Sequence, residues 1–558
     1  MTTKTNNRMI DGAAVNVLDF GADPTGVSDS TSALISAISA GALVSVPSGT
    51  YNVSSTLNIS DTRITGQGEL KQTGTGNYPL VILSGSGEID GLTLTGIVSD
   101  YLIPGGDLSP SEYTLVRMTG THNKLLNCTM TGIQAYGVEI KESDNNIVSG
   151  NSIENTSLGG LVGGDRGRYG VGILGGLYNT IQGNTIRYMT AGISSFKNNY
   201  TGTPSTDFYN LVKRNKYLGN TVEHITEHGI YLSSGSFEVV SDNIIGDTDA
   251  DGIKCRASNS TITGNSVSAA GPVTKLYGTG INIATPSFSC TVSGNVIFSS
   301  KIGIICGPEN MIQYADNQEI PTNINCGRHT IDGNTLTCSD NNSTDQTIGV
   351  RSFGDSEADA TRYDGSVISN NTINWFNTGV VLRRTQKDII TGNKILAHPF
   401  SVVPTTGTIL GSGGSGITND ISADYITIRG NIIMDMPLHG VSLEDSGSVP
   451  IDMSDNLLFS NKGYGINNDI GSGSSAFRCV SNSCHSNVMG AFNKQFGRWA
   501  NFIEDNLASN NEQMIFGAGS PVGVVTPAWQ GALYLDFTNN IGYMATTTAS
   551  SGWKQITA

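Results

Sequence analysis

Isoleucine, glycine and asparagine recur in a fixed order along the middle of the chain. The pattern is Ile-x-Gly-Asn-x-Ile, followed eight or nine residues later by Gly-Ile or Gly-Val. Its shortest intervals, about 22 residues, suit one coil of three short β-strands, and longer intervals add surface loops to the same coil. We therefore predict a stack of twelve parallel coils, marked by Asn127, Asn151, Asn184, Asn220, Asn243, Asn265, Asn295, Asn334, Asn371, Asn393, Asn431 and Asn456.

The polar and apolar positions of this repeat predict where its side chains point. An asparagine in a tight turn can adopt the left-handed conformation and bond its amide to the asparagine of the next coil. The Ile and Val positions on either side then point inward and form a continuous core. Alternation also places the third residue after the glycine inward, as for Leu232, Cys255, Ile283, Cys306, Leu382 and Leu443.

A different pattern precedes the repeat. Residues 29–31, Asp-Ser-Thr, can cap a helix that is predicted by the helical spacing of Ala33, Leu34, Ala37 and Ile38. Residues 44–51 then alternate apolar and polar side chains around a Pro/Gly turn, which is typical of a strand. We expect residues 15–60 to form a cap that closes the open end of the stack.

The same N-terminal segment resembles the start of the pectate-lyase-like β-helix superfamily, which occurs in many bacteriophage tailspikes. The resemblance covers about 60 residues and is carried by Val-Leu-Asp-Phe-Gly-Ala at 17–22, by the helix, and by Pro-Ser-Gly-Thr-Tyr at 47–51. It implies an all-β, right-handed parallel β-helix over residues 61–486. It also implies a polysaccharide depolymerase whose groove runs along the outside of the coils, where pectate lyases and polygalacturonases place their sites.

The ends of the chain have other patterns. Residues 1–14 are polar and are interpreted as a linker or attachment tail, too short for a virion-binding domain, so that a longer spike or an adaptor protein would make that contact. From about residue 487 the repeat fades. Residues 521–554 resemble a small C-terminal β-module of phage tail proteins, and 487–558 are expected to serve trimerisation or carbohydrate binding.

Charge and composition narrow the range of partners. The chain has 558 residues, a formal net charge of −16 and no run of Lys or Arg, whereas nucleic acids and anionic membranes bind concentrated cationic surfaces. Neither is expected as a partner, and no apolar run approaches the roughly 18 residues of a membrane span. The eight cysteines lack metal-ligand spacing and are interpreted as buried thiols, so no metal and no cofactor is expected.

Two adjacent coils, residues 220–231 and 243–256, hold the densest group of candidate catalytic residues. Their register predicts that Glu227 and His228 lie beside Ala250 and Asp251. Glycoside hydrolysis needs one protonated carboxyl group and one ionised one, and crowding of like charges raises one pKa. We predict that the acid/base pair comes from Glu223, Glu227, Asp247, Asp249 and Asp251.

Other side chains are predicted to hold the substrate. His228, Tyr231, Lys254 and Arg256 extend along the same outward face and can bind sugar hydroxyl groups or a carboxylate, and Trp375 is a further candidate for glycan contact.

Alternative assignments of the acidic residues stay open. Residues 247–252 match the opening of an EF-hand calcium loop, although its twelfth position is Ser258 and no helices are expected beside it. Turn hydrogen bonding explains some of the carboxylates. Another acidic patch could be catalytic, either Asp355, Glu357 and Asp359 or Glu444 and Asp445, or the site could be split between subunits. The motif order of polygalacturonases does not occur, so that family is rejected.

The resemblance and the acidic turns favour a tailspike that hydrolyses a bacterial capsule or O-antigen. One alternative is a polysaccharide lyase, in which His228, Tyr231 or Lys254 abstracts a proton and Arg256 neutralises a uronate. Another is a spike that binds its receptor without cleavage. A homotrimer is expected because a lone β-helix should expose faces such as the strands bearing Ile305 and Val381. The expected location is the phage tail, acting outside the host cell.

Overall fold

The computed structural model divides into two units, Met1–Thr335 and Leu336–Ala558. It describes residues 14–556 except 75–77, 98–113, 156–168, 197–211, 270–277, 285–286, 300, 308–326, 340–345, 355–362, 399–400, 406–412, 421–422, 424, 445–450, 470–476, 493–502, 505–506, 509–513, 518–519, 526–532, 537, 540 and 548. The described residues are almost all β-structure, with one α-helix, α1 (Thr31–Ala40). That helix is too short to cross a membrane, and the described residues contain no other candidate.

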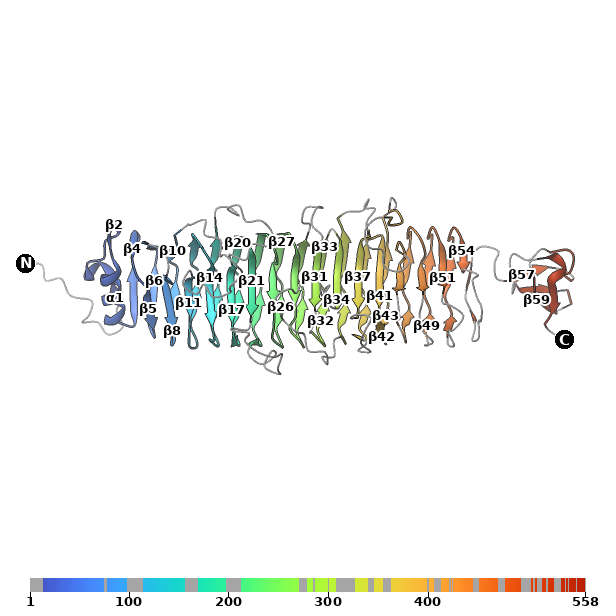
Figure 1. Ribbon diagram of the computed structural model, residues 1–558, viewed down its shortest axis with the longest axis horizontal. Helices are drawn as coiled ribbons and strands as arrows, with labels where there is room; N and C mark the ends of the chain where they lie inside the picture. The colour runs from blue at the N-terminus through green and yellow to red at the C-terminus, as the bar shows by residue number, and fades with distance from the viewer. Residues whose placement is uncertain are drawn as a thin grey trace, which may run out of the picture. The chain divides into compact units, whose positions relative to one another are not determined.

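In each unit, three parallel sheets wind through successive coils in the order A, B, C (Figure 1). In the first unit, sheet A contains β1 (Val15–Asn16), β3 (Leu43–Val46), β6 (Arg63–Gly66), β9 (Glu88–Asp90), β12 (Lys124–Leu126), β15 (Ile147–Ser149), β19 (Thr180–Gln182), β23 (Lys216–Leu218), β26 (Val239–Ser241), β29 (Thr261–Thr263), β32 (Thr291–Ser293) and β35 (Thr330–Asp332). Sheet B contains β2 (Thr25–Asp29), β4 (Thr50–Val53), β7 (Glu69–Gln72), β10 (Thr93–Thr95), β13 (Thr129–Thr131), β16 (Ser152–Glu154), β20 (Thr185–Met189), β24 (Thr221–Ile225), β27 (Ile244–Thr248), β30 (Ser266–Ala269) and β33 (Val296–Ser299). Sheet C contains β5 (Leu57–Ser60), β8 (Val81–Ser84), β11 (Thr114–Met118), β14 (Tyr136–Lys141), β17 (Tyr169–Leu174), β21 (Ala191–Phe196), β25 (Ile230–Leu232), β28 (Asp251–Cys255), β31 (Thr279–Ala284) and β34 (Ile302–Gly307).

The second unit repeats this arrangement. Sheet A contains β39 (Val367–Ser369), β43 (Ile389–Thr391), β46 (Thr427–Arg429), β49 (Ile451–Ser454), β52 (Phe477–Val480) and β55 (Ile503–Glu504). Sheet B contains β40 (Thr372–Asn374), β44 (Lys394–Leu396), β47 (Ile432–Met434), β50 (Leu457–Phe459), β53 (Ser483–His485) and β56 (Leu507–Ala508). Sheet C contains β37 (Ile348–Phe353), β41 (Thr378–Arg383), β45 (Ile417–Asp420), β48 (Val441–Glu444), β51 (Tyr464–Asp469) and β54 (Gly490–Phe492). Strand β36 (Thr335–Cys338) spans the boundary, and two short pairs, β18 (Gly176–Leu177) with β22 (Val212–Lys213) and β38 (Tyr363–Asp364) with β42 (Thr385–Gln386), lie beside the coils.

The predicted asparagine ladder is confirmed at every predicted position except Asn127. In a typical step, the Asn243 amide donates to Oδ1 of Asn265 at 2.9 Å, and the backbone N–H of Asn243 donates to the same oxygen at 3.0 Å. The ladder runs from Asn151 to Asn334 in the first unit, and from Asn371 through Asn456 to Asn482 in the second. All of these side chains are buried, so each coil satisfies polar groups of its neighbour.

The left-handed conformation belongs to a different residue than predicted. The residue before each ladder asparagine adopts it, for example Gly150 at φ 67° and Gly183 at φ 63°. Asn127 fills this exposed position at φ 52°, while Cys128 takes the ladder position and donates its N–H to Asn151. The division follows from geometry, because an amide that reaches the next coil needs a buried site, whereas the tight bend needs a residue that tolerates positive φ.

A second ladder, which the sequence interpretation missed, borders sheet A on its other side. Asn123, Asn146, Asn179 and Asn215 occupy it in successive coils. Glu238 takes the next position and is fully buried; it accepts hydrogen bonds from Tyr217 Oη at 3.1 Å and from the Asn215 amide at 3.5 Å. Burial raises the pKa of Glu238 to about 8, so the side chain is mainly neutral in the folded protein at pH 7.

The inward positions are buried as predicted. Leu232, Cys255, Ile283, Cys306, Leu382 and Leu443 are inaccessible to solvent. Seven cysteines are buried free thiols, and Cys326 lies outside the described residues.

The prediction that Ile305 and Val381 lie on exposed faces is wrong. Their exposed fractions are 8% and 0% within the single chain. Alternation predicts the side of the strand that a residue takes, but not what the rest of the same chain places over that side.

The two ends of the chain carry further elements. In the N-terminal cap, Asp29 accepts the Thr31 N–H at 3.1 Å, and α1 contacts β1, β3 and β5. Parallel pairing continues past residue 487 to β56. Beyond it, β57 (Met514–Gly517), β58 (Leu533–Asp536), β59 (Ile541–Ala545) and β60 (Trp553–Gln555) form a small sheet, which packs Tyr534, Tyr543, Ala545 and Trp553 together.

We expect Asn243→Ala to lower the free energy of unfolding by roughly 1–3 kcal/mol, because it leaves buried N–H groups of Asn220 without their acceptor and removes one of the two donors to Oδ1 of Asn265. Urea denaturation measures the change. Asn127→Gly, at an exposed position outside the ladder, is the control and should shift stability by less than about 0.5 kcal/mol. Equal losses in both variants would contradict the ladder's role.

Glu238 should make stability depend on pH. Its folded-state pKa of about 8 lies above the ordinary glutamate pKa of 4.5, so the folded state binds the proton more tightly and stability falls as pH rises between these values. Thermal unfolding should show Glu238→Gln matching the wild type at about pH 5 and exceeding it by more than about 1 kcal/mol at about pH 9. A constant difference across pH would refute this assignment.

Candidate functional site

The outer face of sheet C in the first unit gathers several predicted site residues. Strand register aligns Ser194, Tyr231, Lys254 and Asn282 in one row across β21, β25, β28 and β31. Successive coils therefore present side chains side by side, about one strand spacing of 4.8 Å apart.

Tyr231 is the centre of this row. Arg256 donates from Nη1 to Tyr231 Oη at 2.8 Å, and its Cζ lies 5.6 Å from the ring centroid. Lys254 Nζ lies 5.4 Å from the same centroid. Both cations are largely buried, with exposed fractions of 8% for Lys254 and 7% for Arg256. Two positive charges are thus held in a partly desolvated site, where they interact strongly with an anion or a polar ligand.

Asp251 and His228 lie at the edge of the row where the strands begin. Asp251 is buried and accepts a hydrogen bond from the Asn282 amide at 3.2 Å. Its Oδ2 lies 3.5 Å from Nδ1 of His228. Burial, together with the charges of Lys254 and Arg256, holds the pKa of His228 well below its usual range, so this imidazole is neutral at pH 7. The site therefore offers a carboxyl group and a neutral base.

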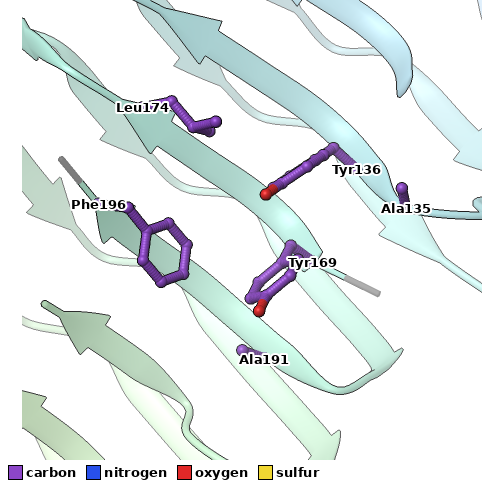
Figure 2. Packing of buried hydrophobic residues seen from close by; sticks show 6 residues of the cluster. All are labelled: Ala135, Tyr136, Tyr169, Leu174, Ala191 and Phe196. Carbon is purple, nitrogen blue, oxygen red and sulfur yellow. The ribbon is translucent and has the colours of Figure 1, made fainter. Parts of the chain in front are cut away.

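A line of aromatic rings, absent from the sequence prediction, leads to Tyr231. Tyr136 stacks on Tyr169 with centroids 5.1 Å apart, and Phe196 meets Tyr169 edge-on at 5.5 Å and Tyr231 at 5.8 Å. Figure 2 shows Tyr136, Tyr169 and Phe196 projecting from neighbouring strands. The sequence contains a pattern that could have predicted two of these rings. Tyr136 and Tyr169 directly precede the glycine of a Gly-Val step, as His228 precedes Gly229.

The structure does not bring the five predicted carboxylates together. Glu223 lies on β24 of sheet B, 3.0 Å from Arg187, and Asp247 lies on β27, 3.1 Å from His224 and 68% exposed. Glu227 and Asp249 are half-buried in the turns that lead to sheet C. The predicted register is confirmed, since Ala250 donates its N–H to the carbonyl of Glu227 at 3.1 Å. The turn between sheets B and C separates Glu223 and Asp247 from Asp251, because the outer faces of the two sheets point in different directions.

The remaining candidates lie elsewhere. Trp375 is in the second unit, 40% exposed, with its ring edge-on to His398 at 5.6 Å. Asp355, Glu357, Asp359, Asp445 and the side chain of Glu444 are outside what the structure describes.

Metal binding finds no support in the described part of the chain. It contains no group of three or more His, Cys, Asp or Glu side chains that could hold an ion. The EF-hand-like segment is divided between β27 and β28, so it forms no calcium loop of that type.

The fold has known relatives. The family model described as "Right handed beta helix region" matches residues 114–297 and 303–481. No curated protein matches the chain. Solved structures with a similar fold include PfbA, a surface adhesin of Streptococcus pneumoniae, at 14% identity and TM-score 0.42, covering 75% of this chain and 94% of the adhesin. They also include an exopolygalacturonase from Thermotoga maritima, at 12% identity and TM-score 0.43, covering 69% and 92%. With well over half of its length matched by the family model, the chain belongs to the right-handed beta helix family.

Proposed function

We propose that this chain binds and hydrolyses glycosidic bonds of a bacterial surface polysaccharide on the outer face of sheet C. The observation that carries the proposal is the position of Asp251, a buried carboxyl group held by Asn282, beside a row that contains Tyr231 and two buried cations.

Substrate binding follows from the chemistry of this row. Aromatic faces contact the apolar faces of sugar rings, and guanidinium and ammonium groups donate to sugar hydroxyl groups or to a carboxylate. Because Tyr231 accepts a bond from Arg256, the cation and the ring are held in a fixed relation. A sugar at Tyr231 would therefore lie within reach of both Lys254 and Arg256.

Hydrolysis requires a second carboxyl group. Glu227 and Asp249 are the candidates, because both lie in the turns next to the start of β28, which Asp251 opens. In this scheme one carboxylic acid protonates the leaving oxygen, and the other activates water or attacks the sugar.

A lyase is the second candidate, and His228 favours it. A neutral imidazole can accept a proton from the carbon next to a uronate carboxylate, and Lys254 or Arg256 can neutralise that carboxylate. Only elimination leaves a carbon–carbon double bond in the product.

We also propose the biological setting: a homotrimeric phage tailspike, attached to the tail or an adaptor protein through its N-terminus and acting on a capsule or O-antigen. The terminal sequence resemblances support this setting. The burial of Ile305 and Val381 means that any trimer contact must use other surfaces.

Asp251→Asn should lower cleavage about 10²–10⁴-fold, the usual contribution of acid–base catalysis. A panel of purified capsules and O-antigens, followed by mass analysis of the fragments, measures cleavage, and absorbance of an unsaturated uronate identifies elimination. Asp247→Asn is the matched control, since Asp247 is exposed on sheet B, and should keep wild-type activity. Wild-type protein that shortens no polysaccharide, or equal losses in both variants, would exclude the proposal.

The trimer is tested by sedimentation equilibrium. We expect a mass three times that of the 58.6 kDa chain. A monomer over the micromolar range would overturn the trimer and leave the cleavage assay unaffected.

A further inference from the structure

Three large side chains occupy equivalent turn positions in consecutive coils of the first unit. Tyr178, Arg214 and Phe237 have φ values of 60°, 58° and 59°, in the left-handed region. Backbone bonds fix their order, since Tyr178 N–H donates to the carbonyl of Lys213 at 3.0 Å, and Arg214 N–H to that of Ser236 at 3.1 Å. We call these three residues the turn platform.

The turn itself does not require large side chains. The same position holds Asn145 in the coil before the turn platform and Asn259 in the coil after it, both also at positive φ. Asparagine adopts this conformation at low cost, whereas an aromatic or arginine side chain is strained there. Strain retained in three neighbouring coils points to a role other than making the turn.

The turn platform is exposed and ordered by its own contacts. The guanidinium carbon of Arg214 lies 5.5 Å from the ring centroid of Tyr178 and 5.8 Å from that of Phe237, and Arg214 donates to Tyr178 Oη at 2.6 Å. Tyr178 is 47% exposed and Phe237 49% exposed. The result is a solvent-facing surface of two rings with a cation between them.

The turn platform carries an exposed positive charge. Arg214 is exposed and has no carboxylate within ion-pair distance among the described residues, and the exposed Lys216 follows it two residues later. A cationic surface on a chain of net charge −16 selects for an anionic ligand. Its aromatic rings add affinity for flat, partly apolar faces, such as those of sugar rings.

We propose that the turn platform is a second glycan-binding surface, which holds acidic sugar units of a polysaccharide. The choice of a glycan rests on the proposed function. The turn platform follows β17, β21 and β25, and these strands carry Tyr169, Phe196 and Tyr231 of the outer face. A long polymer bound on sheet C would thus meet the turn platform as it leaves the same coils.

The test is affinity electrophoresis in gels that contain polygalacturonate, alginate or neutral dextran. Wild-type protein should be retarded by the two acidic polymers and not by dextran. Tyr178→Asn/Phe237→Asn should weaken this retardation about tenfold, since it removes both stacking faces. Asparagine suits the left-handed turn, so the variant should unfold at or above the wild-type temperature.

Tyr425→Asn is the matched control. Tyr425 is 48% exposed at φ 56° in the second unit, where it occupies the equivalent turn position. This variant should be retarded like the wild type. Unchanged retardation of the double variant, an equal loss in Tyr425→Asn, or no retardation of the wild type by either acidic polymer would each overturn the proposal. So would a stronger shift with oligo-dT, which would identify a nucleic-acid surface.

Cleavage and gel retardation distinguish a failure of the proposed function from a failure of the turn platform. Asp251→Asn should lose cleavage and keep its retardation, whereas the double variant should lose retardation and still cleave short fragments. If the wild type cleaves nothing, the proposed function fails, and the gel shifts still decide the turn platform.

Discussion

The buried amide of each ladder asparagine can be satisfied only by the neighbouring coil. Asn243 illustrates the constraint: its oxygen accepts from Asn220, and its nitrogen donates to Asn265 and to the carbonyl of Tyr217. An amide left unpaired inside the stack would cost much of a coil's stability, so every coil must stand in register with the next. This register positions all other side chains, on the inside and the outside alike.

The ladders and the apolar interior hold the coils together. The outer faces can therefore carry charged side chains whose burial costs free energy. Lys254 and Arg256 are buried against Tyr231, and His228 faces a buried carboxyl group. Such contacts contribute little to stability, since desolvation offsets much of the attraction between charges. They are tolerated because β28 is paired on both sides, and the same pairing keeps the charged groups in place for a ligand.

The sequence predicted the features that depend on local periodicity. The ladder positions other than Asn127, the inward cysteines and the contact of Glu227 with Ala250 are confirmed. Features that depend on three-dimensional direction were missed. The direction of the chain changes between β27 and β28, so Asp247 and Asp251 face different surfaces although only three residues lie between them. The second ladder was missed because Glu238, Ser260 and Cys290 replace asparagine after its first four coils, so the position is defined by the backbone and not by one residue type.

The span from Asn243 to Asn265 has a consequence for how such a protein can change over evolutionary time. This single coil carries Asp251, Lys254 and Arg256, and both of its ends are ladder asparagines. Removal of the whole coil would leave Asn220 facing Asn265, and these two side chains can form the same amide–amide hydrogen bond as the other ladder pairs. Exchange of one coil could therefore replace the chemistry of the site while the scaffold stays intact, and activity and fold can be inherited separately.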